Sequence, residues 1–169
     1  YLGESITEGQ VLIDGMNLAR ISKSRAHILR RKLGIIFQDY KLIPGKTVFQ
    51  NIALVLEARG LAPRFIQKKV HSVLRTVGME DRSRAFQIGL SGGEQQKVAF
   101  ARAVVGEPKI ILADEPTGSL DADAAETIFD LLTTFHKRGA TILFATHDTD
   151  LIHNTKHRII HLKQGRLQV

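Results

Sequence analysis

Two adjacent carboxylates follow a short apolar run in this 169-residue chain. The residues Ile110 to Ala113 are all apolar, and Asp114 and Glu115 come directly after them. Such a run predicts a buried strand, and in open α/β sheets ligands bind at the carboxyl ends of the strands. There Asp114 would offer a hard oxygen to Mg²⁺, and Glu115 would accept a proton from an attacking water. A plain polar strand end is the alternative interpretation of this pair taken alone.

A second pattern, Ser91-Gly92-Gly93, stands immediately before a predicted helix. Ser91 is suited to cap that helix, and the two glycines leave backbone N–H groups uncovered at its positive end. A helix end of this kind binds anions such as phosphate. In isolation, an ordinary loop with a helix cap explains the same residues equally well.

Five short motifs extend over most of the chain: Ile35 to Asp39, Leu90 to Gln95, Ile110 to Glu115, Pro116 to Asp121 and Ala145 to Asp148. In this order they resemble the glutamine loop, the signature motif, the Walker B strand, the D-loop and the switch-histidine loop of ABC-type ATPases. Five motifs in one shared order do not arise by chance. The chain is therefore identified, by resemblance, as the nucleotide-binding domain of an ABC-type ATPase.

The resemblance implies ATP and Mg²⁺ as cofactors, and it implies a role for each motif residue. Gln38 would contact Mg²⁺ or the lytic water, Asp114 would hold Mg²⁺ through water, and Glu115 would be the general base. His147 would hydrogen-bond the γ-phosphate and position the attacking water. The residues that would face the ATP of the opposite subunit, or communicate across the dimer interface, are Ser91, Gly92, Gly93, Gln95 and Asp121.

Hydrophobic periodicity predicts the elements that must position these residues. The predicted strands are 33–37, 110–113 and 141–145, and the predicted helices are 47–59, 63–77, 91–105 and 121–137. Strand and helix alternate at both ends around a mainly helical middle, which predicts an α/β fold with a parallel sheet. We expect one domain over 1–169, with a helical subdomain at 45–103 inserted into the α/β core of 1–44 and 104–169. The resemblance makes this core that of a P-loop NTPase.

The phosphate-binding loop of such a core, G-x-x-x-x-G-K-[ST], does not occur in the sequence. Its backbone amides cradle the phosphates, and its Lys and Ser/Thr serve the terminal phosphates and the metal. Gly45-Lys46-Thr47 matches the last three positions, but Tyr40 stands where the first glycine is required. We therefore expect the amino-terminal part of the domain, which carries this loop, to be missing here. We also expect this piece to be inactive as an ATPase by itself.

Charge and composition limit the classes of function only loosely. The formal net charge is +7 and cysteine is absent, so disulfides and thiolate metal sites are excluded. No apolar run reaches the roughly 18 residues that a membrane-spanning helix needs. Basic residues gather in 20–32 and 64–69 without interleaved aromatic residues. Solvated helix faces are one interpretation of these clusters, and a surface that faces a membrane or a partner is the other.

The stretch from Phe37 to Ile52 resembles the FtsE cell-division branch of the family. That resemblance implies an ATPase that forms a homodimer on binding ATP and is peripheral to the cytoplasmic face of the inner membrane. It would act on the membrane protein FtsX and so control septal peptidoglycan hydrolysis. The alternatives are the ATPase of a lipoprotein-releasing or macrolide-type exporter, and a soluble ABC ATPase that acts on nucleic acid. We expect no nucleic-acid partner, because the long coiled-coil insertions of that last class are lacking.

Overall fold

A parallel sheet of three strands lies at the centre of the computed structural model, which describes residues 8–149, 152 and 156–168. The strands are β3 (Leu33–Ile36), β4 (Ile110–Asp114) and β5 (Thr141–Ala145), and β4 is the middle one. All pairs are parallel, with Ile36 opposite Ala113 and Ala113 opposite Phe144. The predicted parallel sheet is confirmed, and its three carboxyl ends meet at one edge.

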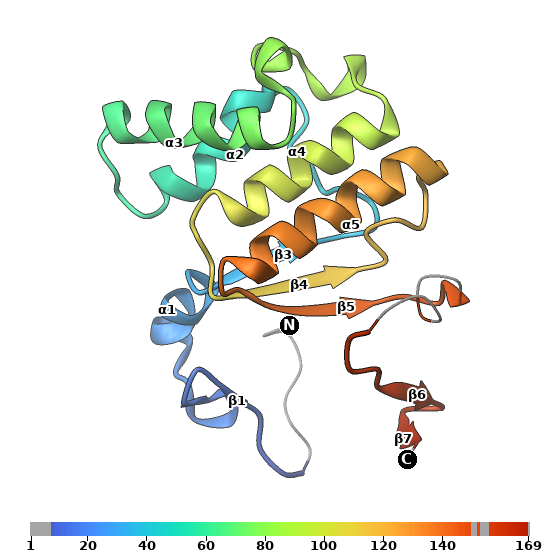
Figure 1. Ribbon diagram of the computed structural model, residues 1–169. Coiled ribbons are helices and arrows are strands. Elements are labelled where there is room, and N and C mark those ends of the chain that lie inside the picture. The colour runs from blue at the N-terminus through green and yellow to red at the C-terminus, as the bar shows by residue number, and fades with distance from the viewer. Residues whose placement is uncertain (1–7, 150–151, 153–155, 169) are drawn as a thin grey trace.

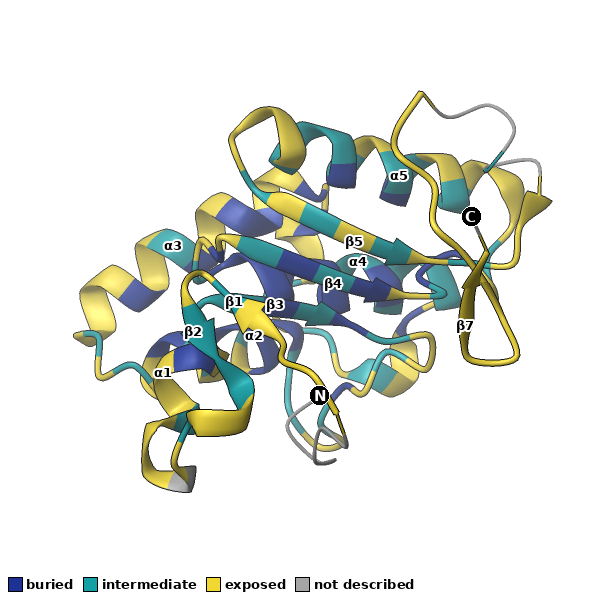
Figure 2. Cartoon of the chain, turned by 90° about the horizontal axis from the view of Figure 1, so that it is seen from below, coloured by how far each residue is buried: buried dark blue, intermediate teal, exposed yellow. Residues whose placement is uncertain are grey.

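The longer helices form layers on one face of this sheet (Figure 1). The helices α4 (Gly92–Val104) and α5 (Ala122–Lys137) lie against the strands, and α2 (Val48–Glu57) and α3 (Pro63–Thr76) lie beyond α4. Seen from below in Figure 2, β4 and β5 are in view with no described helix in front of them. The sheet therefore contributes a buried face toward α4 and a second face that the described helices leave uncovered.

The core lies between the sheet and the helical layers. Its largest side chain is Phe100 of α4, which is fully buried and packs edge-to-face on Phe135 of α5 at 5.4 Å between ring centroids. Ile36 and Ile111 of the sheet and Ile52 of α2 are also fully buried. Because α4 contacts the sheet and α5 on one side and α2 and α3 on the other, it is the central element of the packing.

A glycine sets how closely β3 approaches α4. A Cβ atom placed at Gly34 would lie 2.5 Å from the backbone oxygen of Ala103, which is inside van der Waals contact. Any side chain at this position would push the strand away from the helix. The strand Leu33-Gly34-Ile35-Ile36 thus combines apolar, strand-forming residues with a glycine at a position where it approaches the helix backbone.

The remaining elements are short. They are the hairpin β1 (Leu12–Ile13) and β2 (Met16–Asn17), the helix α1 (Ala26–Arg30), the hairpin β6 (His161–Lys163) and β7 (Arg166–Gln168), and the 3₁₀ turns Leu18–Arg20, Lys23–Arg25, Glu80–Arg82 and Gln87–Gly89. Across the described residues, every helix is too short or too polar to cross a membrane.

Candidate functional site

Three strand ends bring the predicted catalytic residues to one edge of the sheet. Gln38 follows β3 by two residues, Asp114 ends β4 with Glu115 directly after it, and His147 follows β5 by two residues. Parallel strands place these ends side by side, although the residues are far apart in sequence. We refer to Gln38, Asp114, Glu115 and His147 as the strand-end cluster.

Glu115 and His147 contact one another directly. The Oε1 atom of Glu115 accepts from the backbone N–H of His147 at 2.9 Å and from the ring Nδ1 of His147 at 2.7 Å. Its Oε2 accepts from the hydroxyl of Thr146 at 3.3 Å. Glu115 has a φ of +44°, in the left-handed region that side-chain-bearing residues seldom adopt. Such conformations persist where the surroundings hold them, typically at functional sites.

The contact favours the charged form of His147. The hydrogen bond that His147 donates to Glu115, and then the negative charge of Glu115, raise the pKa of His147. The side chain of Glu115 is 20% exposed and that of His147 is 83% exposed, so the imidazole stands toward solvent. With Nδ1–H donated to Glu115, Nε2 carries a proton only in the imidazolium form. A protonated His147 can therefore hold Glu115 with one nitrogen and donate to an anion with the other.

Asp114 and Gln38 have the chemistry of weak magnesium ligands. Within the described residues the Asp114 carboxylate makes no hydrogen bond or ion pair, and it is exposed at the strand end. The amide Nε2 of Gln38 lies 3.4 Å from where a Cβ at Gly118 would be, so its side chain lies over the loop that follows Glu115. The described residues include no group of three or more His, Cys, Asp or Glu able to hold a metal. One carboxylate and one amide suit Mg²⁺, which keeps several waters and takes further ligands from phosphates.

The predicted anion site at the start of α4 is a formed helix cap. The Ser91 hydroxyl accepts from the backbone N–H of Glu94 at 3.2 Å, and the Glu94 carboxylate accepts from the backbone N–H of Ser91 at 2.8 Å. This is a capping box. The hydrogen bond from Ser91 lowers the pKa of Glu94, although partial desolvation opposes it and Arg82 nearby adds to the lowering.

An open pocket of about 370 Å³ lies between the starts of α4 and α5. It contains four of the five predicted partner-facing residues, which are Ser91, Gly92, Gly93 and Asp121. Asp121 caps α5 by accepting from the backbone N–H of Ala124 at 2.8 Å. Lys97 adds a positive charge to the wall, and Glu94 and Asp123 are acidic residues of the same wall. We call this the signature pocket.

Gln95, the fifth predicted partner-facing residue, does not line the signature pocket. Its amide nitrogen donates to the backbone oxygen of Leu90 at 3.2 Å, and its amide oxygen accepts from Gln87 at 3.2 Å. The structure therefore ties this side chain to the loop ahead of α4.

Sequence reasoning missed a buried amide, Gln96, which joins α4 to the loop after Glu115. Gln96 is 0% exposed, and its Nε2 donates to the backbone oxygen of Pro116 at 2.6 Å. Its Oε1 has no partner among the described residues. A signal was present, because Gln96 lies four residues before the apolar Phe100 on the same helix face, and a buried amide requires a partner.

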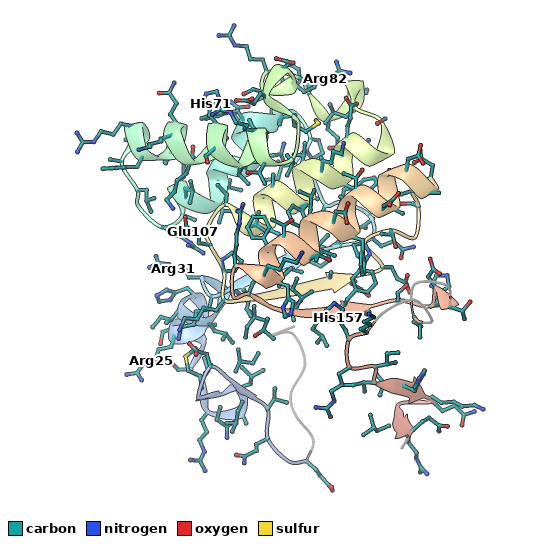
Figure 3. All side chains as sticks on the ribbon, viewed as in Figure 1. Arg25, Arg31, His71, Arg82, Glu107 and His157 are labelled. Atoms are coloured by element: carbon teal, nitrogen blue, oxygen red, sulfur yellow. The ribbon has the colours of Figure 1, made fainter. Side chains whose placement is uncertain are left out.

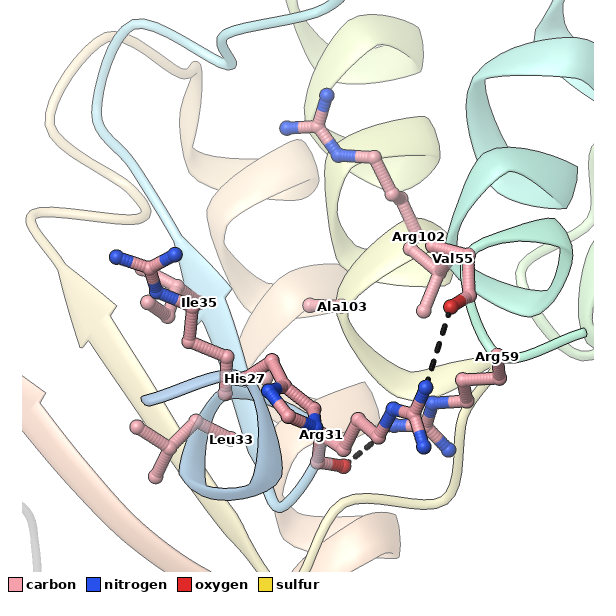
Figure 4. Close-up of a pocket in the computed structure, with 11 residues that line it drawn as sticks. His27, Arg31, Leu33, Ile35, Val55, Arg59, Arg102 and Ala103 are labelled. Carbon is pink, nitrogen blue, oxygen red and sulfur yellow. Dashed lines mark hydrogen bonds between the residues drawn. The ribbon is translucent and has the colours of Figure 1, made fainter. Parts of the chain in front are cut away.

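A second and larger pocket, of about 430 Å³, lies where α1 and β3 meet α2 and the end of α4 (Figure 4). Its apolar wall includes Leu33, Ile35 and Val55. Its basic residues are His27 and the four arginines Arg30, Arg31, Arg59 and Arg102. We call it the basic pocket. Arg30 and Arg31 of the basic cluster at 20–32, for which a solvated helix face and a membrane- or partner-facing surface are the two interpretations, thus line a concave surface.

Two arginines of the basic pocket, Arg31 and Arg59, are held close together. Arg59 donates to the backbone oxygens of Gly106, at 2.6 Å, and of Arg31, at 2.5 Å, next to which it lies in Figure 4. Burial, and then the charge of Arg31, lower the pKa of Arg59, while Glu107 opposes that effect. Figure 3 shows Arg31 and Glu107 on the side of the molecule where α1 meets the helical layers.

Comparison with known proteins agrees with the motifs. The protein-family model described as ABC transporter matches residues 2–118. The FtsE cell division ATP-binding protein of Streptococcus pneumoniae is 44% identical over 167 residues, which are 99% of this chain and 73% of that protein. The FtsE of Bacillus subtilis is 42% identical over 165 residues, covering 98% of this chain and 72% of its own length.

The fold has solved counterparts as well. The ATP-binding cassette MJ0796, in a dimeric post-hydrolysis state bound to ADP and Pi, superimposes with a TM-score of 0.88 at 33% identity. The match covers 99% of this chain and 75% of that one. The predicted cassette fold is confirmed. The order of the motifs, the meeting of three strand ends at one edge and these similarities agree: the chain belongs to the ABC transporter family.

Proposed function

We propose that this chain is the FtsE-like, ATP-binding and ATP-hydrolysing subunit of a membrane complex that acts in cell division. The observation that carries the proposal is the strand-end cluster, in which a backbone-constrained Glu115 is hydrogen-bonded by His147 beside Asp114 and Gln38. The identity of 41 to 44% with FtsE proteins of four organisms or strains supports the cell-division assignment.

In this proposal each member of the strand-end cluster has one task. Glu115 accepts the proton of the attacking water, and its carboxylate is held by Thr146 and His147. His147, in its protonated form, orients Glu115 through Nδ1 and donates from Nε2 to the γ-phosphate. Asp114 and Gln38 would hold Mg²⁺, which supplies charge neutralisation on the terminal phosphates when it is bound.

The signature pocket would contact the ATP bound to the partner subunit, whereas the strand-end cluster acts on the ATP of its own subunit. In a symmetric homodimer, one surface of each subunit faces the partner. The backbone N–H groups at the start of α4 and the Lys97 ammonium suit a phosphate that arrives from outside the chain. The dimeric state of the similar cassette MJ0796 supports this arrangement.

The basic pocket suits an acidic partner segment. Its apolar wall and four arginine side chains would bind a short amphipathic element with carboxylates, from a permease-like membrane subunit. We propose FtsX as that subunit and the cytoplasmic face of the inner membrane as the location. We also propose that 45–103 is a helical subdomain, since α2 and α3 lie wholly within it.

The substitution Glu115→Gln in the full-length protein tests the hydrolytic assignment. It preserves the shape of the side chain and removes the proton acceptor, so we expect hydrolysis to be abolished while an ATP-bound dimer accumulates. Single-turnover hydrolysis and size-exclusion chromatography with ATP measure both effects. Near-normal turnover would refute Glu115 as the base. Co-purification from membranes with an exporter permease, in place of FtsX, would reassign the partner.

A further inference from the structure

The backbone just after Gln38 is held in an unusual conformation. Tyr40 has a φ of +59° and Lys41 a φ of +47°, so two consecutive residues with long side chains are left-handed. This conformation is unfavourable for such residues and needs support from its surroundings. The support comes from α4, because Arg102 donates to the backbone oxygen of Tyr40 at 2.7 Å and to that of Lys41 at 2.5 Å.

The consequence is a defined direction for the Tyr40 side chain. Its hydroxyl is 3.1 Å from the hydroxyl of Ser119, in the loop between Glu115 and α5. The same oxygen lies 3.0 Å from where a Cβ at Gly92 would be, at the first residue of α4. One phenol oxygen therefore hydrogen-bonds the loop that follows Glu115 and occupies the space beside Gly92, a residue of the signature pocket.

We propose that Tyr40 is a positioning residue that couples the strand-end cluster to the signature pocket through its hydroxyl. The inference rests on the proposed function, because it assigns the two regions to the two halves of a composite ATP site. Gln38 lies two residues from Tyr40 and over the same loop, next to Gly118. A displacement of Gln38 by nucleotide is thus transmitted through Tyr40 to Ser119 and Gly92, and a closing of the signature pocket is transmitted back.

Two substitutions remove the contact without altering the ring or the backbone. Tyr40→Phe deletes only the phenol oxygen, and Ser119→Ala deletes only its partner. The matched control is Ser24→Ala, which breaks the exposed pair between the hydroxyls of Ser22 and Ser24 at 2.9 Å. The single variants, the double variant and the control are made in the full-length protein. Their kcat, their KM for ATP and their unfolding equilibria are then compared.

We expect Tyr40→Phe to lower kcat about fivefold, the effect of one lost hydrogen bond. The KM for ATP stays within about twofold, because the phenol does not touch nucleotide in this account. The double variant should be no worse than Tyr40→Phe, since both changes break one contact. Ser24→Ala should leave kcat unchanged. A role confined to stability would lower the midpoint of unfolding and leave kcat as it was.

Two results would overturn the inference: an unchanged kcat in Tyr40→Phe, or losses in the single variants that multiply in the double variant. If the unsubstituted protein does not hydrolyse ATP, the proposed function fails instead. The unfolding equilibria of the two single variants and the double variant, measured without nucleotide, then test the Tyr40–Ser119 contact by themselves. Non-additive effects of about fivefold on the unfolding constant support the contact, and strictly additive effects refute it.

Discussion

The strand-end cluster and the signature pocket are built in opposite ways. The first is made of side chains from three strands, and its central residue, Glu115, is held by groups more than thirty residues further along the chain. The second is made largely of backbone at two helix starts, and the caps of Ser91 and Asp121 are formed within three residues. The difference predicts that side-chain chemistry controls the first region, whereas the space around glycine controls the second.

The largest expected effect is in the strand-end cluster. His147→Ala removes the donor to Glu115 and the group that faces the γ-phosphate, so kcat should fall by about two to four orders of magnitude. His161→Ala, on the exposed hairpin β6–β7, is the matched control and should leave kcat unchanged. Steady-state ATPase assays measure both variants. A loss of less than about tenfold would remove His147 from the catalytic machinery.

The next effect is steric and belongs to the signature pocket. A Cβ at Gly93 would lie 3.1 Å from the Cβ of Ala124, so Gly93→Ala should push the starts of α4 and α5 apart. We expect ATP-dependent dimerisation to weaken about tenfold, by roughly 1.4 kcal/mol. Analytical ultracentrifugation measures the association. Gly89→Ala is the control, because nothing lies within 4 Å of its Cβ position, and equal weakening in both variants would contradict the steric account.

The pH dependence of stability tests the strand-end cluster without a change in the size of any side chain in the signature pocket. The pKa of His147 is raised in the folded state by Glu115. The contribution of the pair to stability is therefore fully present below the ordinary histidine pKa, about 6.5, and is lost as the pH rises through the raised value. We expect the stability difference between the parent and Glu115→Gln to shrink from pH 6 to pH 9 in chemical denaturation. A stability difference that grows with pH would show that the Glu115 contact does not raise the pKa of His147.

The smallest effect is a local one. Asp121→Ala removes the cap of α5 and should cost about 1 kcal/mol of unfolding free energy. Asp130→Ala, an exposed mid-helix position, controls for the loss of a charge. Urea titrations measure the two variants. Equal costs would show that the cap contributes nothing beyond charge.

The sequence was sufficient for features that depend on neighbours along the chain. The strand ends at Asp114 and Ala145 and the cap at Ser91 follow from apolar runs and a capping residue, and the structure has each of these elements. The contacts of Tyr40 and Gln96 could not be predicted in this way. They depend on how α4 packs against two distant loops, a relation that neither periodicity nor spacing encodes.

The central claim is that the two regions of one chain serve two different ATP molecules, and mixed dimers test it most directly. In a mixed dimer of Glu115→Gln with Ser91→Arg, both lesions fall in one composite site and the other site stays intact. Each variant alone should be inactive. A one-to-one mixture should recover about a quarter of the parent ATPase rate, because half of the dimers are mixed and each has one intact site. No recovery, with mixed dimers shown to form, would mean that both regions serve the same ATP.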